Sequence, residues 1–310
     1  MSEKKEFTEE EKKAYAEKKK AELAAEYKLI DETAEKIFTR SENPADIIKL
    51  LDIYSKFSYM GINNALLIFA KFPNAQEIHP KKYWEEHNFR AKRGTHSFTL
   101  LERGDEYIKK DGSKGYGRNV VKYCDVSQVT APFREPERTE YSSHTLIKAL
   151  LKSCPIKYEN YDPADSTDVW NDNIIAKYYP NDRVIRIRKN LEYDVFFRHF
   201  STAIVMSMLD RGGDFVSNER LYLFEAKCIS YLLCKRYNID TSDFDFDDIP
   251  SEYMNYDTTR IKKTLYEITE VSKVINEKMY RGVQDVLKEY QNEVNNAPAG
   301  NNGAKSEPMR

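Results

Sequence analysis

Basic residues alternate with aromatic residues between Lys71 and Lys122. This segment holds twelve Lys or Arg and seven Asp or Glu, so it has a local positive excess although the formal net charge of the chain is −2. Its aromatic residues include Phe72, Tyr83, Trp84, Phe89, Phe98, Tyr107 and Tyr116. Cationic side chains neutralise phosphates, and flat rings stack on unpaired bases. The segment therefore predicts a surface that binds single-stranded nucleic acid without sequence preference.

The same residues also have ordinary structural interpretations, which the sequence leaves open. Trp84 and its neighbour Tyr83 can belong to the core, because Trp is usually largely buried. Asn63 and Asn64 begin a predicted helix, where they either cap it or leave backbone N–H groups available to a phosphate. A solvated face is the corresponding interpretation for Lys81, Lys82, Lys92 and Arg93.

Short motifs in this region follow one another in a recognisable order. They are YMGINNALLI from Tyr59, FPNAQEI from Phe72, YWEEHNFRAKRGTHSFTLLE from Tyr83 and YCDVSQVT from Tyr123. Over about residues 40–130 this order is similar to the N-terminal single-stranded-DNA-binding domain of ArdC-type antirestriction proteins and their LtrC-like relatives on conjugative elements. Together with the basic and aromatic composition, this resemblance predicts nucleic-acid-binding residues at Tyr59, Asn63, Asn64, Lys81, Lys82, Tyr83, Trp84, Lys92 and Arg93. Asp125 and Gln128 are expected to tie a strand end to its neighbours rather than to touch bases.

The resemblance implies a second domain similar to a zinc metallopeptidase. Such a domain carries His-Glu-x-x-His on one helix, with a Glu further along as the third ligand. The corresponding helix here reads FFRHFSTAIVMSML. If His199 is the first ligand, Phe200 replaces the base and Ala203 the second ligand. In the other alignment Arg198, His199 and Thr202 stand where the first His, the Glu and the second His should be.

Neither alignment leaves more than one His, and Glu225 stands where the third ligand would be. One His and one Glu do not make the three-ligand site that zinc hydrolysis needs. We therefore expect a pseudo-peptidase domain with no catalytic residue, no metal and no cofactor, in which His199 and Glu225 are remnants. The acidic stretch from Asp240 to Asp257 holds seven carboxylates and no basic residue. It is interpreted as a solvated loop, a protein-docking surface or a mimic of DNA charge.

Around these candidate residues the hydrophobic pattern predicts an α+β protein. Asn43 and Pro44 begin a predicted helix, and Gly61 interrupts the pattern before a second one over Ala65–Phe72. Strands are expected at 96–101 and 116–126, joined by a polar loop over 102–115. The second half predicts a helix over 143–153 capped by Ser143, a hairpin of 174–179 with 183–188, and helices over roughly 192–210, 218–237 and 257–290.

These elements divide the chain, with a boundary near residues 131–141. The predicted parts are a charged helical extension over 1–40, a single-stranded-DNA-binding-like domain over 41–135, a pseudo-metallopeptidase-like domain over 141–290 and a disordered tail over 291–310. No apolar run reaches the roughly 20 residues of a membrane helix, and the N-terminus lacks the apolar core of a signal peptide. The four cysteines are scattered without a Cys-x-x-Cys pair, which argues against a disulfide framework and a thiolate zinc site. We expect a cytoplasmic protein.

The predicted function is sequence-nonspecific binding of single-stranded DNA by a protein of a mobile element or phage, in antirestriction or strand protection. Its expected partners are single-stranded DNA and a host defence protein. Two alternatives remain open at this point. One is a protein-directed inhibitor of a host restriction or CRISPR nuclease, and the other is a metallopeptidase with an altered metal site.

Overall fold

The computed structural model describes residues 8–39, 44–135, 139–161, 175–213 and 215–296. By its internal contacts the chain divides into two compact units, which we call unit 1 (Met1–Pro136 with Tyr253–Lys263) and unit 2 (Glu137–Glu252 with Thr264–Arg310). Each unit combines helices with one three-stranded sheet. The predicted α+β class is confirmed. No helix in the described ranges is long and apolar enough to cross a membrane.

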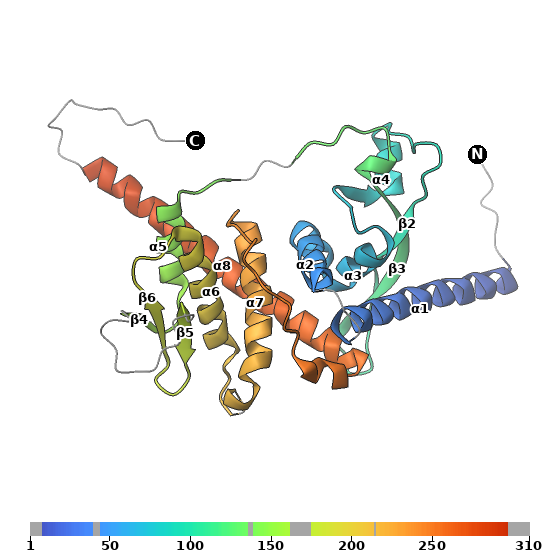
Figure 1. The fold of residues 1–310 in the computed structure, drawn as a ribbon. Helices are drawn as coiled ribbons and strands as arrows, with labels where there is room; N and C mark the ends of the chain where they lie inside the picture. Colours follow the sequence, from blue (N-terminus) through green and yellow to red (C-terminus); the bar gives the residue numbers. More distant parts are fainter. Residues whose placement is uncertain (1–7, 40–43, 136–138, 162–174, 214, 297–310) are drawn as a thin grey trace. The chain divides into compact units, whose positions relative to one another are not determined.

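Unit 1 contains a bundle of helices beside its sheet (Figure 1). The helices are α1 (Glu9–Thr39), α2 (Ala45–Phe57), α3 (Ile62–Lys71) and the short α4 (Lys81–Glu86). The first turns of α1 are exposed, and burial begins at Glu26, as the charge blocks of the extension indicate. Asn43, the predicted cap of α2, lies outside the described residues.

Helix α3 begins earlier than the sequence predicts. Gly61 stands at its N-cap with φ 79°, a left-handed conformation that favours glycine. Asn63 and Asn64 therefore lie inside the first turn, and neither is the cap residue. The apolar pattern misses this turn because Asn64 is buried through hydrogen bonds rather than through apolar packing.

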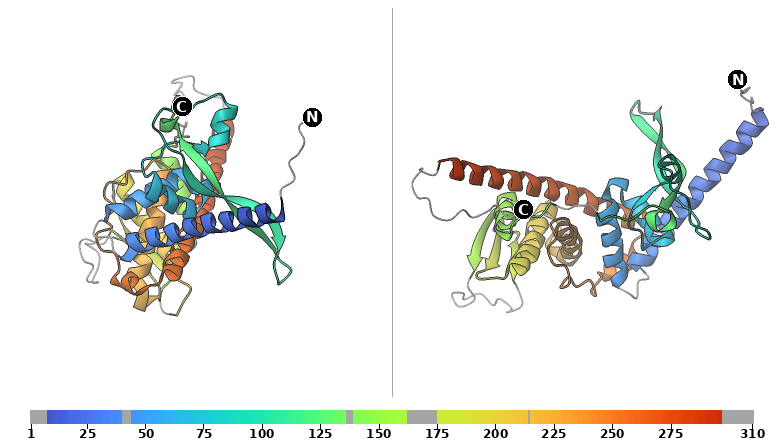
Figure 2. Two further views of the ribbon diagram at one scale, coloured as in Figure 1. Left: turned by 90° about the vertical axis from the view of Figure 1, so that its right-hand side faces the viewer. Right: turned by 90° about the horizontal axis from the view of Figure 1, so that it is seen from above.

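The sheet of unit 1 is antiparallel, in the order β1-β3-β2. Its strands are β1 (Ile78–Pro80), β2 (Phe98–Ile108) and β3 (Lys114–Asp125). The polar loop expected over 102–115 is wrong, because strand pairing continues out to Ile108 and Lys114. This outer part of the hairpin has solvent on both faces, so it lacks the alternation of apolar and polar residues by which strands are recognised. Figure 2 shows the β2–β3 hairpin extending away from the helices of unit 1.

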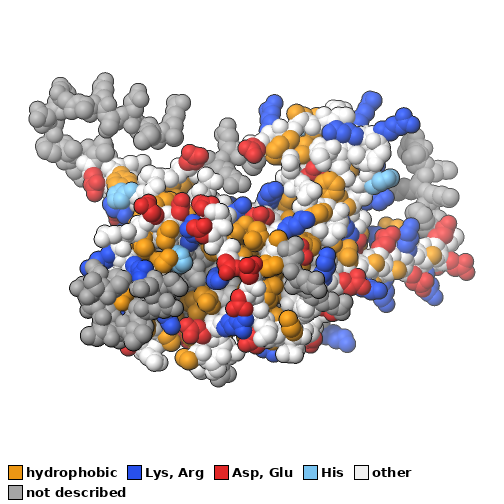
Figure 3. Space-filling view, viewed as in Figure 1, with side chains coloured by type: hydrophobic (Ala, Val, Ile, Leu, Met, Phe, Trp, Pro, Cys, Tyr) orange, Lys and Arg blue, Asp and Glu red, His pale blue; other side chains and the backbone are white. Residues whose placement is uncertain are grey.

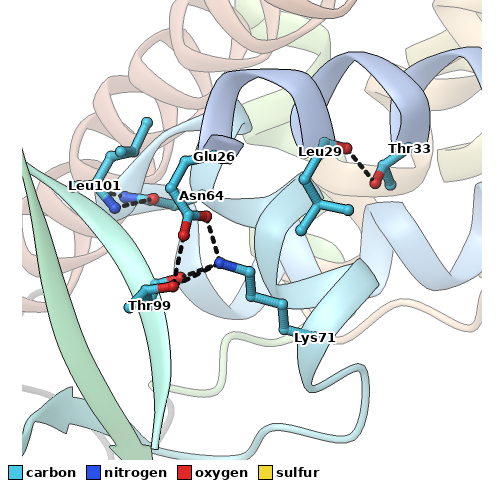
Figure 4. A network of polar contacts seen from close by, with 7 residues as sticks. All are labelled: Glu26, Leu29, Thr33, Asn64, Lys71, Thr99 and Leu101. Carbon is cyan, nitrogen blue, oxygen red and sulfur yellow. Dashed lines mark hydrogen bonds and ion pairs between the residues drawn. The ribbon is translucent and has the colours of Figure 1, made fainter. Parts of the chain in front are cut away.

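A polar network joins α1, α3 and β2 in unit 1 (Figure 4). The Lys71 ammonium pairs with the Glu26 carboxylate and donates to Thr99 Oγ1 at 2.7 Å. Thr99 Oγ1 in turn donates to Glu26 Oε1 at 2.6 Å. Beside this network the Asn64 amide donates to the Leu101 carbonyl at 2.8 Å and accepts from the Leu101 N–H at 2.9 Å. These hydrogen bonds satisfy backbone groups on the unpaired edge of β2 and so fix the inner end of the β2–β3 hairpin.

Unit 2 packs helices on a mixed sheet of order β4-β6-β5. The strands are β4 (Lys157–Tyr161), β5 (Ala176–Tyr179) and β6 (Val184–Arg188), and β4 pairs with β6 in parallel. The predicted hairpin is confirmed as β5 and β6, whereas β4 is not predicted. The described residues do not include 162–174, and this gap takes in Ile174, the first residue of the predicted hairpin.

The helices of unit 2 follow the hydrophobic pattern closely. They are α5 (Ser143–Ser153), α6 (Tyr193–Leu209), α7 (Glu219–Arg236) and α8 (Thr258–Asn296). The predicted cap of α5 is wrong by one position, because Ser142 Oγ accepts from the Thr145 N–H. Helix α8 begins in unit 1 and continues through unit 2 to Asn296, so it runs into the tail expected from 291, while 297–310 lie outside the described residues.

Candidate nucleic-acid interface

The basic residues of the segment Lys71–Lys122 differ in what already neutralises them. Four of the twelve are ion-paired: Lys71 with Glu26, Lys81 with Glu85, Lys82 with Glu86 and Lys114 with Glu106. Lys92 donates to the Ser127 carbonyl at 3.0 Å. Within the described residues, no ion pair is formed by Arg90, Arg93, Arg103, Lys109, Lys110, Arg118 or Lys122. These side chains are the ones available to phosphates.

Three of the basic side chains without an ion pair lie on one face of the β2–β3 hairpin. Arg103 and Arg118 are direct cross-strand partners, so their side chains share a face. Tyr116 and Lys122 lie two and four positions from Arg118 in β3 and therefore belong to the same face. We call Arg103, Tyr116, Arg118 and Lys122 the basic face. All four residues are exposed.

Two features characterise the basic face: a cross-strand pair of like charges, and a guanidinium stacked on an aromatic ring. Like charges directly opposite each other destabilise a strand pair, so the Arg103–Arg118 pair gains from a bound anion. The Arg103 guanidinium lies 3.3 Å from the centroid of the Tyr116 ring, which holds it flat against the strand. The arrangement offers cations and one aromatic ring along an extended, exposed ladder. The predicted nucleic-acid-binding residues include none of these cations. The period-two spacing of Tyr116, Arg118 and Lys122 is the sequence signal that indicates their shared face.

Helix α4 carries four of the predicted residues, of which Trp84 is core. Its indole is 3 % exposed and donates to the Cys124 carbonyl at 3.0 Å. Val126 and Val129 complete this small core, and Phe89 packs against it. The prediction that Trp84 is a stacking platform is therefore wrong, because its ring is almost completely buried.

Tyr83, Lys81 and Lys82 are held by partners within the same segment. The Tyr83 ring lies between His79 and His87, with centroid distances of 3.9 and 4.1 Å. Lys81 and Lys82 are exposed and each pairs with the Glu four positions later, which is worth little in stability. The three residues remain at the surface, but their charges and ring faces are partly occupied.

Tyr59, Asn63 and Asn64 surround the start of α3 without forming one site. Tyr59 is 73 % exposed, while Asn64 is buried and bonded to β2. Partial burial and the nearby Glu77 carboxylate raise the pKa of Tyr59, so an acidic group faces this end of the helix. Asn63 is half-buried in the first turn, where no side chain caps the helix.

Lys92 and Arg93 lie in the exposed turn before β2, where Gly94 has φ 82°. The turn is tied down by Gln128, whose carbonyl accepts from the Lys92 N–H and whose amide donates to the His96 carbonyl. Asp125 closes the other side by accepting from the N–H groups of Gln76 and Glu77. Asp125 and Gln128 therefore act as structural ties, as the sequence indicates. Arg93 forms no ion pair with any residue that the structure describes, so its charge remains available.

Helices α6 and α7 of unit 2 hold the peptidase-like residues. Arg198 is buried on α6, and its guanidinium bonds Asp243 Oδ2 at 2.5 Å and the Asp240 carbonyl at 3.1 Å. The Arg198 carbonyl accepts from Ser230 Oγ of α7 at 3.1 Å. Burial, with the charges of Arg198 and Lys227, lowers the pKa of His199 and keeps its ring neutral.

These residues do not fit a metal ion. Phe200 is fully buried, and Thr202 Oγ1 donates back to the Arg198 carbonyl at 2.8 Å. A buried guanidinium next to His199 repels a divalent cation. Glu225 is half-buried on α7. In the part of the chain that is described, no three His, Cys, Asp or Glu side chains are grouped so that they could hold a metal ion.

The acidic stretch that follows α7 is anchored to the two helices. Asp240 and Asp243 pair with Arg198, Asp248 pairs with Arg220, and the Asp245 carbonyl accepts from Lys227. Several of its charges are therefore neutralised within unit 2. This pairing weakens the interpretation as a DNA charge mimic.

Comparison with known proteins finds a similarity to solved structures. No protein-family model and no curated protein matches the chain. The metal-free crystal structure of the antirestriction protein ArdC from plasmid R388 is similar, with a TM-score of 0.57 and 13 % identity over 82 % of this chain and 98 % of that chain. The Mn(II)-bound structure of the same protein gives a TM-score of 0.47 and 12 % identity, over 71 % and 84 % of the two chains. The resemblance predicted from the sequence is confirmed at the level of the fold: this chain has the fold of the ArdC antirestriction protein.

Proposed function

We propose that this protein binds single-stranded DNA through the basic face of unit 1. The observation that carries the proposal is the direct cross-strand pair of Arg103 and Arg118, neither of which forms an ion pair in the described residues. The Glu106 carboxylate acts on Arg103 but is already paired with Lys114. A phosphate placed across the pair relieves its repulsion. The next phosphates along a strand meet Lys122 on one side and the exposed turn at Lys109 and Lys110 on the other.

Single-stranded rather than double-stranded DNA suits this surface. The hairpin is a narrow two-stranded ribbon on which the Arg103 guanidinium lies over the Tyr116 ring, and an unpaired base can stack on this flat pair. A duplex keeps its bases stacked and presents only phosphates. The similarity in fold to an antirestriction protein supports a role in protecting incoming DNA from host restriction.

Unit 2 takes no catalytic part in this proposal. Arg198, His199 and Thr202 occupy the positions at which the resemblance puts peptidase residues. Arg198 is bonded to Asp243, Thr202 Oγ1 donates to the Arg198 carbonyl, and His199 has no second histidine beside it with which to form a ligand set. Unit 2 then serves as a scaffold or as the docking surface for a host defence protein.

The test is a titration of the full-length protein with single-stranded and duplex oligonucleotides over a range of salt. The logarithm of the affinity should fall with the logarithm of salt by about 0.7 per phosphate neutralised on a single strand. Arg118→Ala should weaken binding at low salt and reduce this slope by about 0.7. Lys20→Ala, which removes one charge from the exposed part of α1, is the matched control and should leave the slope unchanged.

Tighter binding to duplex, or an unchanged slope in Arg118→Ala, would overturn the proposal. Protection of unmodified DNA on entry into a restricting host provides the cellular measurement, and it should fall in Arg103→Ala/Arg118→Ala. If protection persists in that variant and the protein captures a host nuclease after nucleic acid is digested, the protein-directed alternative is correct. Zinc retained in stoichiometric amount would favour the metallopeptidase alternative instead.

A further inference from the structure

A hollow opens beside Trp84 on the surface of unit 1. It has a volume of about 370 Å³, at the small end of the range for small-molecule sites. Trp84, Phe89, Cys124 and Val129 form its apolar floor. The charged residues of its lining are the ion pair of Lys81 with Glu85, and Arg90. Trp84 and Phe89 meet edge to face, with centroids 6.0 Å apart.

The walls of the hollow are held by backbone bonds on three sides. The Phe89 N–H donates to the Trp84 carbonyl at 2.8 Å, and the Thr130 N–H donates to the Arg90 carbonyl at 2.9 Å. Ala91 forms an antiparallel bridge with Val129. The hollow is therefore preformed, so little conformational entropy of its walls would be lost when a ligand binds.

We propose that this hollow binds one unpaired nucleobase of the DNA strand. The proposal rests on the proposed single-strand binding and adds a second contact to it. A flat heterocycle can stack on the half-buried Phe89 ring, behind which Trp84 is buried, and its own phosphate reaches Arg90. Arg90 has no acidic partner among the described residues. An apolar peptide side chain in the hollow would leave the Arg90 charge without a counter-ion, whereas a nucleotide supplies its phosphate.

The charge around the hollow favours the same occupant. Between Lys81 and Arg93 the chain carries five Lys or Arg and two Glu. Figure 3 shows Lys and Arg side chains bordering the part of unit 1 that carries α4, whereas α1 displays both signs of charge. Burial raises the pKa of the Cys124 thiol, so the sulfur meets a base as an uncharged group.

Fluorescence of Trp84 tests the proposal directly in the full-length chain. The protein has two tryptophans, and Trp170→Phe leaves Trp84 as the only emitter. An oligothymidylate should change the Trp84 emission, and an abasic oligonucleotide of equal length should bind with little change. Ala91→Phe, which fills the hollow from an exposed position, should abolish the emission change and weaken oligothymidylate binding about tenfold. Ala16→Phe on the exposed part of α1 is the matched control.

The outcomes separate the two proposals. If both oligonucleotides bind equally and neither changes Trp84 emission, the base site is overturned while single-strand binding through the basic face stands. If neither oligonucleotide binds at low salt, the proposed function fails and the base site fails with it. The abasic comparison uses unaltered walls, so it decides the question even if Ala91→Phe folds poorly.

Discussion

The Glu26 carboxylate on α1 and the Lys71 ammonium at the end of α3 form an ion pair that also holds Thr99 of β2. Both charged side chains are largely buried, so each depends on the other for compensation. The pair connects the helices of unit 1 to the root of the β2–β3 hairpin, and with it to the basic face.

Glu26→Ala should therefore destabilise the protein by about 3–5 kcal/mol, because it leaves the Lys71 charge buried without its partner. Glu26→Leu combined with Lys71→Met removes both charges and should recover much of the loss. Urea unfolding followed by circular dichroism measures both variants. A loss in the double variant as large as in Glu26→Ala would show that packing, rather than the unpaired charge, sets the cost.

Trp84→Ala should cost about 3–5 kcal/mol of stability, because it empties the small core under α4. Trp84→Phe keeps an aromatic ring but leaves the Cys124 carbonyl without its indole donor, so its cost should be smaller. Thermal or urea melts compare the two variants. If Trp84→Ala left stability unchanged, the indole would not have the buried position found here.

His199 should make stability depend on pH. Burial and neighbouring positive charges put its pKa in the folded chain below its ordinary value of 6.5. Above about pH 6.5 the ring is neutral in both states and its contribution is complete. As the pH falls below 6.5 the unfolded chain takes up the proton first, so stability is lost until the pH passes the folded pKa.

His199→Gln should flatten this part of the stability profile, measured by urea unfolding at a series of pH values. His96→Gln alters an exposed histidine and serves as the control. Equal slopes in wild type and His199→Gln would contradict the prediction.

Gly282 of α8 lies directly against the backbone of α5. A Cβ atom added there would lie 2.8 Å from the Ala149 carbonyl oxygen and 3.1 Å from its Cα, both backbone atoms that cannot turn aside. Gly282→Ala should therefore cost about 1–3 kcal/mol although alanine favours helix. Arg281→Ala, at the exposed neighbouring position, should change the free energy of unfolding by no more than about 0.5 kcal/mol. A Gly282→Ala protein as stable as wild type would mean that the two helices can separate without loss.

The sequence predicts the parts of this fold that bury one regular apolar stripe. Helices α6 and α7 begin and end within a residue or so of their expected bounds for that reason. The part of β2 beyond Leu101 and the first two residues of β3 escape prediction because solvent lies on both faces of the hairpin there. Strand β4 escapes because its pairing with β6 depends on contacts distant in sequence.

The candidate site shows a similar limit. Composition identifies the charged segment, but it does not show which cations are already paired, as Lys81 and Lys82 are. It also leaves open whether Trp84 faces solvent or core, since that depends on the position of β3 beneath α4. The cross-strand register of Arg103 and Arg118 is known only from the structure.

Residues 253–263 complete unit 1 although they lie more than a hundred positions after its other residues. Tyr253 is fully buried with its ring 5.3 Å from that of Phe38, and Lys262 pairs with Asp31 of α1 at 2.6 Å. The chain that supplies them continues as α8 into unit 2. The two units therefore cannot be exchanged between proteins as two continuous pieces of chain. A genetic crossover near residue 137 would deliver a first unit without part of its own core, so new combinations of such units must exchange the segment 253–263 as well.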